Sequence, residues 1–138
     1  MADIQLDPYI FFTGECKEAM DFYKGVFGGD LKMQTYDEVP EEAKMPGMEG
    51  KIMHSLLSGG AIRLMASDGT RKDPYPAGPI SLSMSGSDEA QLTEIFNKLA
   101  EGGEITMKLD KQFWGDIFGG VTDKYSIEWM VNVNAKEE

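Results

Sequence analysis

The sequence predicts an α+β fold made of two similar modules in tandem, each with the order strand, helix, strand, strand, strand. The first observation is a repeat, in which "GKIMHSLLSGGAIRLM" at 50–65 matches "GDIFGGVTDKYSIEWM" at 115–130 with four identical residues at one offset. The second is another pair of similar segments earlier in each copy, since "FGGDLKM" at 27–33 resembles "EGGEITM" at 101–107. The third is a helical pattern of apolar residues before each double glycine. Two copies of one unit are therefore expected, rather than a solenoid, which needs three or more repeats.

Each predicted helix carries one apolar stripe, whose residues recur at spacings of three and four. The stripe of the first helix is Cys16, Ala19, Met20, Tyr23, Val26 and Phe27, and that of the second is Leu92, Ile95, Phe96 and Leu99. This spacing is typical of amphipathic helices. Thr13 is the N-cap expected for the first helix and Ser87 or Asp88 for the second, and the double glycines are expected to end the helices in the left-handed conformation.

Strand candidates surround both helices. They cover 8–12, 31–36, 51–57 and 61–66 in the first copy, and 79–84, 105–109, 116–121 and 126–133 in the second. We therefore expect one domain, 1–138, with a first βαβββ module over 5–67 and a second over 79–134. The segment 68–78 contains Asp-Gly and several prolines, and is predicted to be the linker.

Composition narrows the class of protein. The chain has 138 residues, of which 41% are hydrophobic, as in an ordinary globular protein. The net charge of −11 argues against a nucleic-acid partner and agrees either with a cationic ligand or with solubility alone. No apolar run approaches the roughly 20 residues of a membrane span, and "MADIQLDP" has no hydrophobic leader, so a cytoplasmic protein without a membrane partner is expected. The single cysteine, Cys16, excludes an intrachain disulfide and a cysteine-based zinc site.

Arg63 and Glu128 occupy matching positions in the two copies. Strand side chains alternate between two faces, so Arg63 shares a face with Met65, and Glu128 shares one with Met130, opposite the apolar residues that should pack on the helices. Two interpretations stay open. The pair lines a ligand site and is partly buried, or both residues are exposed strand charges that contribute little stability.

Three stretches together resemble the PhnB-like branch of the vicinal oxygen chelate superfamily, which includes glyoxalase I, bleomycin- and fosfomycin-resistance proteins and extradiol dioxygenases. They are "PYIFFTGECKEAMDFYKGVFGG", "KIMHSLLSGGAIRLMASD" and "FWGDIFGGVTDKYSIEWMVN". The resemblance covers residues 8–133. It implies that the paired βαβββ modules form a curved open sheet or barrel around a cleft, as in the glyoxalase and bleomycin-resistance proteins, and that the chain forms a homodimer.

The resemblance also implies where metal-dependent members would hold a metal. The four places fall on Pro8, Arg63, Pro79 and Glu128, and only Glu128 has a side chain that binds metals. A catalytic divalent site normally has about three protein ligands and an open position. No cofactor is therefore expected, and any divalent metal would use Glu128 together with His54, the only histidine in the chain.

Two functions follow as alternatives. In the first, the chain binds a small organic molecule in a cleft between the modules, and the predicted lining consists of Phe12, Arg63, Met65, Trp114 and Met130. In the second, it is a lyase or isomerase in which Glu128 acts as a general base or metal ligand, and His54 or Arg63 polarises an oxygen atom.

Three of these residues have ordinary structural interpretations as well. His54 has the alternative interpretation of a hydrogen-bonded structural residue, which is the usual role of a lone histidine. Trp114, with Phe113, either anchors a core or lines the mouth of the pocket. Cys16 lies on the helix stripe, where a buried small side chain is expected rather than a nucleophile. The sequence does not identify the ligand.

Overall fold

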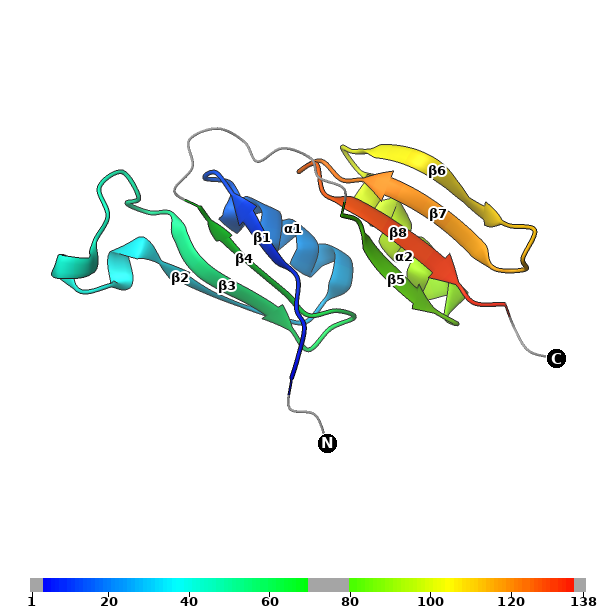
Figure 1. Ribbon diagram of the computed structural model, residues 1–138, viewed down its shortest axis with the longest axis horizontal. Helices are drawn as coiled ribbons and strands as arrows, with labels where there is room; N and C mark the ends of the chain where they lie inside the picture. The colour runs from blue at the N-terminus through cyan, green and yellow to red at the C-terminus, as the bar shows by residue number, and fades with distance from the viewer. Residues whose placement is uncertain (1–3, 70–79, 136–138) are drawn as a thin grey trace. The chain divides into compact units, whose positions relative to one another are not determined.

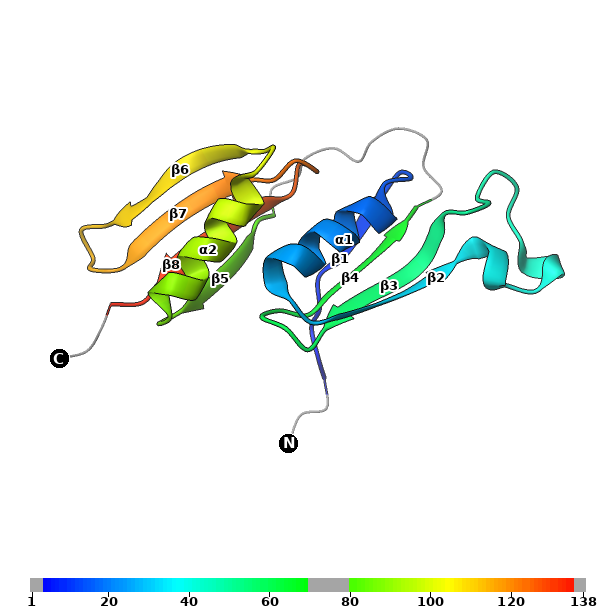
Figure 2. The ribbon, with the colours of Figure 1, turned by 180° about the vertical axis from the view of Figure 1, so that it is seen from behind.

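The computed structural model describes residues 4–69 and 80–135. The chain divides into two compact units, Met1–Pro76 and Ala77–Glu138. Each unit holds one four-stranded sheet with a single helix across one of its faces, as the two opposite views show (Figures 1 and 2). The predicted α+β fold with two βαβββ modules is thereby confirmed.

Unit 1 follows the order β1 (Tyr9–Phe12), α1 (Cys16–Phe27), β2 (Asp30–Thr35), β3 (Ile52–Ser58) and β4 (Leu64–Asp68). Two short 3₁₀ helices, η1 (Tyr36–Glu38) and η2 (Glu41–Ala43), lie between β2 and β3. The order across the sheet, called sheet 1 below, is β1-β4-β3-β2, with β1 parallel to β4 and the other neighbours antiparallel. The first and last strands of the unit therefore lie side by side.

Unit 2 repeats this plan with β5 (Leu82–Gly86), α2 (Glu89–Ala100), β6 (Glu104–Lys111), β7 (Ile117–Thr122) and β8 (Glu128–Val133). Its sheet, called sheet 2, has the order β5-β8-β7-β6, again with a parallel pair between its first and last strands. The match between the two orders shows that the sequence repeat corresponds to a structural one.

The apolar stripes of both helices form the cores. All six stripe residues of α1 and all four of α2 are buried. On the sheets they meet buried side chains such as Leu57 and Leu64 in unit 1, and Val121, Trp129 and Val131 in unit 2. Fully burying one such side chain contributes about 2 kcal/mol, so these stripes are the main reason the helices form.

The starts of the helices differ from each other. Asp88 caps α2 as predicted, because its Oδ1 accepts a hydrogen bond from Gln91 N at 3.1 Å. Thr13, the cap predicted for α1, does not fill that role. The N-cap is Glu15, without a side-chain bond, and Asp68 of β4 accepts from Cys16 N at 3.0 Å instead. A residue distant in sequence therefore satisfies the first turn of α1.

Two element boundaries also differ from expectation. β4 begins at Leu64 rather than at 61, because Ala61 N donates to Phe27 O in the turn that precedes it. Asp68, assigned above to the linker, is the last residue of β4. The rest of that linker, 70–78, and Pro79 lie outside the described residues. Gly28 and Gly102 have positive φ as expected at the helix ends. Within 4–69 and 80–135, no helix is long and apolar enough to cross a membrane.

Candidate functional site

One face of sheet 1 packs on α1, and the other, called the open face of sheet 1, points away from the helix. The side chains of the open face are not part of the core. Leu57 and Leu64 pair with each other and are fully buried, so they identify the face of the sheet that packs on the helix. Alternation then places Tyr9 and Phe11 of β1 and Met65 of β4 on the open face. Tyr9 and Phe11 are 39% and 51% exposed, and their ring centroids are 5.1 Å apart. β1 therefore gives this face two adjacent aromatic rings.

His54 of β3 belongs to the same open face. Its Nδ1 lies 3.2 Å from the Tyr9 hydroxyl oxygen, and the two ring centroids are 5.8 Å apart. The histidine is half-buried. Its one hydrogen-bond partner in the described chain thus comes from β1, two strands away across the sheet.

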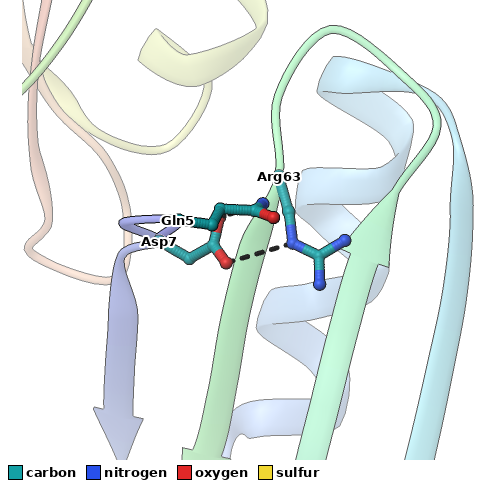
Figure 3. Close-up of polar contacts among 3 residues, drawn as sticks. All are labelled: Gln5, Asp7 and Arg63. Atoms are coloured by element: carbon teal, nitrogen blue, oxygen red, sulfur yellow. Dashed lines mark hydrogen bonds and ion pairs between the residues drawn. The ribbon is translucent and has the colours of Figure 1, made fainter. Parts of the chain in front are cut away.

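Arg63 lies just before β4, beside the residues that lead into β1 (Figure 3). Its Nε donates to Asp7 Oδ2 at 3.1 Å, and Gln5 Nε2 donates to Asp7 Oδ1 at 3.0 Å. The Arg63 side chain is 42% exposed and that of Asp7 only 11%. Because solvent screens a half-exposed pair, this contact contributes little to stability, and its effect is to orient the guanidinium on the open face.

Sheet 2 has a corresponding open face, opposite α2, with a different chemistry. Glu128, the first residue of β8, accepts a weak hydrogen bond from Ser81 Oγ at 3.4 Å. Met130 is the next residue of β8 on the same face. Gly120 of β7 pairs with Met130, and Asn132 follows Met130 on this face. Unit 2 thus presents a half-buried carboxylate and the Ser81 hydroxyl group where unit 1 presents an arginine and aromatic rings.

The register of the sheets shows which residues lie beside Arg63 and Glu128. Pro8 precedes Tyr9, whose partner is Met65, so the residue beside Arg63 is Asp7 rather than Pro8. In unit 2, the residue beside Glu128 is Ser81, while Pro79 lies outside the described residues. The two prolines begin the strand patterns in the sequence, whereas the cross-strand pairing decides which side chains meet.

Phe12 and Trp114 are placed differently from each other. Phe12 is 3% exposed and lies on the helix side of β1, in the core, so Tyr9 and Phe11 supply the aromatic rings of the open face. Trp114 lies in the turn between β6 and β7, half-exposed, with its ring centroid 4.9 Å from that of Phe113 and 6.2 Å from that of Phe118. Phe118 pairs with Asn132, so this tryptophan extends an aromatic cluster from the turn to the open face of sheet 2.

Cys16 is a core residue. It is fully buried, and its Sγ lies 3.7 Å from Ser55 Oγ. Burial raises the pKa of the Cys16 thiol from 9.0 to about 12, with smaller opposing and additional effects from Ser55 and Asp68. A thiol with this pKa is almost entirely protonated at neutral pH and is a poor nucleophile.

The residues at the family's metal positions in unit 1 are poorly suited to a divalent cation. In unit 1 the position holds the cationic Arg63, and both carboxylate oxygens of its neighbour Asp7 are bonded. Throughout the described ranges, no group of three or more His, Cys, Asp or Glu side chains is arranged to hold a metal ion.

Comparison with known proteins agrees with this architecture. The family model of the glyoxalase/bleomycin resistance protein/dioxygenase superfamily matches residues 5–131. The chain belongs to this superfamily. Within it, the chain is 31% identical over 140 residues to protein YjdN of Escherichia coli K12, covering 93% of this chain and 94% of YjdN.

Two solved structures of the superfamily fold show the same arrangement over nearly the whole chain. Protein PA1353 of Pseudomonas aeruginosa is 37% identical, with a TM-score of 0.84 over 97% of this chain and all of that one. A PhnB protein of Bacillus cereus is 26% identical, with a TM-score of 0.74 over 95% of this chain and all of that one. The PhnB-like resemblance seen in the sequence is confirmed by these neighbours.

The sequence contained a signal for the residues missed above. In "DPYIFF", Asp7, Tyr9 and Phe11 alternate with Pro8, Ile10 and Phe12. The period of two is visible, but it does not show which of the two sets faces the helix. That assignment required the pairing with β4.

Proposed function

We propose that the chain binds a small organic molecule, without a metal ion, using the open faces of its sheets. The observation that carries this proposal is the set of half-exposed side chains on the open face of sheet 1, where Tyr9, Phe11, His54, Met65 and Arg63 combine apolar area with a few oriented polar groups. Sites for small ligands have this composition. We further propose that Met130, Glu128 and Trp114 of unit 2 contribute to the same cleft, and that the protein acts in the cytoplasm as a homodimer.

The test is a screen of small organic compounds by thermal shift, followed by calorimetric titration of the hits. Met65→Ala in unit 1 and Met130→Ala in unit 2 should both raise the Kd of the same compound about tenfold, since each deletion removes roughly 1–2 kcal/mol of apolar contact. Ile80→Ala, an exposed residue ahead of β5, is the matched control and should leave the Kd unchanged. A compound affected by only one of the two methionine variants would refute the shared site.

A second candidate function is a lyase or isomerase. Glu128 supports it, because this carboxylate is half-buried on an open face, and the 3.4 Å contact with Ser81 is its one side-chain hydrogen bond within the described residues. A general base needs a carboxylate that can reach the substrate, and Glu128 fits that requirement better than the saturated Asp68. With a substrate in hand, Glu128→Gln should lower kcat by a factor of about 100 or more while binding persists.

We do not propose methyl transfer, although the name of the Bacillus cereus relative includes a 3-demethylubiquinone-9 3-methyltransferase. Nucleotide-like cofactors bind doubly wound folds at the carboxyl ends of parallel strands, beside a glycine-rich turn. In this chain most strand neighbours are antiparallel, and each sheet has only one parallel pair.

A further inference from the structure

We propose that Tyr9 is a positioning residue that holds His54 as a hydrogen-bond donor, and that the open face of sheet 1 therefore takes a ligand with an acceptor oxygen next to an aromatic or apolar body. The inference rests on the proposed function, because it assigns the ligand chemistry of the same face. It also assigns a role to Tyr9, a residue that neither the repeat nor the family positions single out.

The two side chains meet across the sheet rather than along the chain. Tyr9 of β1 pairs with Met65 of β4, which in turn pairs with Leu56 of β3. His54 is two residues before Leu56, so it lies one side-chain position along the same face. The Tyr9 ring spans this diagonal, and its hydroxyl oxygen reaches Nδ1 at 3.2 Å.

This contact determines which imidazole nitrogen carries hydrogen. A neutral imidazole has one donor and one acceptor nitrogen, whereas a tyrosine hydroxyl can both donate and accept. A phenol O–H is the stronger donor of the two groups, so the hydroxyl donates to Nδ1 and the hydrogen of the ring lies on Nε2. In the imidazolium form both nitrogens donate, and Nε2 again carries hydrogen.

The Nε2–H group is then available to a ligand. No residue in the described part of the chain accepts a hydrogen bond from it. Its neighbours on this face are the Tyr9 ring and the exposed Gln34 of β2, the cross-strand partner of His54, and Phe11 and Met65 lie next to Tyr9. A nitrogen that carries hydrogen neither accepts a proton nor binds a metal. His54 therefore polarises or orients an oxygen of the ligand, such as a carbonyl oxygen, instead of acting as a base or as a metal ligand.

The tautomer can be measured directly because the chain has a single histidine. Tag-free protein labelled with ¹⁵N-histidine gives one pair of ring nitrogens in a long-range ¹H–¹⁵N spectrum. We expect hydrogen on Nε2 in the wild type and a mixture of tautomers in Tyr9→Phe, which keeps the ring and loses the hydroxyl. Tyr36→Phe is the control, since its hydroxyl bonds Asp68 O at 3.0 Å, and it should leave the tautomer unchanged.

A wild-type spectrum with hydrogen on Nδ1 would overturn the proposal, and so would a Tyr9→Phe spectrum identical to the wild type. The wild-type measurement alone decides the tautomer if the variant does not fold. No ligand is needed, so a negative result here leaves the proposed binding function standing.

The ligand class has its own test with a matched pair of probes. Acetophenone carries an acceptor oxygen on an aromatic body, and α-methylstyrene has the same shape with a methylene group in place of the oxygen. Acetophenone should shift the Nε2 signal in the wild type and shift it at least threefold less in Tyr9→Phe, whereas α-methylstyrene should move only signals of the surrounding face. An Nε2 signal that acetophenone leaves unmoved up to its solubility limit would contradict the assignment of an oxygen acceptor.

Discussion

Polar side chains of this protein fall into two groups that differ in how completely their hydrogen bonds are satisfied. Asp68 accepts from the backbone nitrogens of Gly14, Cys16 and Ile52, and Asp123 accepts from two backbone nitrogens and from Trp129 Nε1. Both carboxylates are buried. Such saturated groups hold the fold together, because a buried charge is tolerated only when its bonding capacity is filled. The half-exposed polar residues of the open faces, such as His54 and Glu128, have fewer hydrogen bonds than these two carboxylates.

Asp68→Asn should lower the free energy of unfolding by about 3 kcal/mol. The substitution removes the charge and puts an NH₂ group where a backbone N–H now donates, at Gly14 and Cys16 or at Ile52. Urea denaturation followed by tryptophan fluorescence measures the change. Asp37→Asn is the control, because Asp37 is exposed and accepts only from Gly50 N, and a loss there as large as at Asp68 would contradict the role given to burial.

The Cys16 thiol should make the protein less stable in alkali. Its pKa is raised from 9.0 in the unfolded chain to about 12 in the fold, so its contribution to stability is complete below pH 9 and is lost as the pH rises from 9 toward 12. Relative to Cys16→Ala, which lacks this ionisation, the wild type should lose about 1.4 kcal/mol per pH unit in that window. Parallel curves of unfolding free energy against pH for the two proteins would show the prediction to be wrong.

At the scale of the elements, the turns carry geometric constraints that the strands alone do not show. Gly60, in the turn between β3 and β4, lies against the end of α1. A Cβ there would meet backbone atoms of Phe27 and Gly28 at 2.5 Å. The backbone of this turn therefore packs directly on the backbone at the end of the helix. Because the turn includes this contact, β4 begins only at Leu64.

Gly60→Ala should therefore destabilise the protein by about 2 kcal/mol or more, since backbone cannot move aside as a flexible side chain would. The matched substitution is Gly25→Ala in α1, where an added Cβ meets nothing within 4 Å. Alanine has a higher helix propensity than glycine, so Gly25→Ala should raise the stability by about 0.5–1 kcal/mol. Thermal melts of the two variants compare them, and effects of the same sign would refute the packing argument.

At the scale of the whole molecule, the repeat has kept its architecture while the chemistry of the two open faces has diverged. Arg63 with Asp7 in unit 1 corresponds to Glu128 with Ser81 in unit 2. Equivalent places in the two halves thus carry opposite charges. A ligand on the open face of sheet 1 would therefore meet an arginine, and a ligand on the open face of sheet 2 would meet a carboxylate.

Protein purified without a histidine tag should contain less than one tenth of an equivalent of zinc, nickel, manganese or iron by elemental analysis, because the donors at the family's positions do not form a divalent site. Addition of each ion should leave the Tm unchanged. A stoichiometric metal that disappears in both Glu128→Gln and His54→Ala would favour the enzyme alternative, with a rearranged site. In Glu49→Gln, an exposed control, the metal content should equal that of the wild type.

Much of the candidate site could be predicted, but only to within one residue along a strand. The repeat indicates Arg63 and Glu128, alternation indicates Met65 and Met130, and His54 stands out as the only histidine. The structure places each of them on or beside an open face. Phe12 was chosen in place of its neighbour Phe11, because a slip of one residue exchanges the two faces of a strand. Whether Arg63 and Glu128 serve one ligand stays a prediction.

The sequence by itself determined the two βαβββ modules and the stripes of both helices, and it narrowed the cap of α2 to Ser87 or Asp88, since these depend on periodicity and on contacts between residues close in the chain. The tertiary structure alone decided which residues of β1 lie on the open face, that Asp68 accepts from the first turn of α1, and that the Tyr9 hydroxyl contacts His54. Each of these depends on pairing between strands that are 40 or more residues apart. Local sequence patterns do not determine the register of these strand pairs, because the packing of the whole sheet on its helix sets that register.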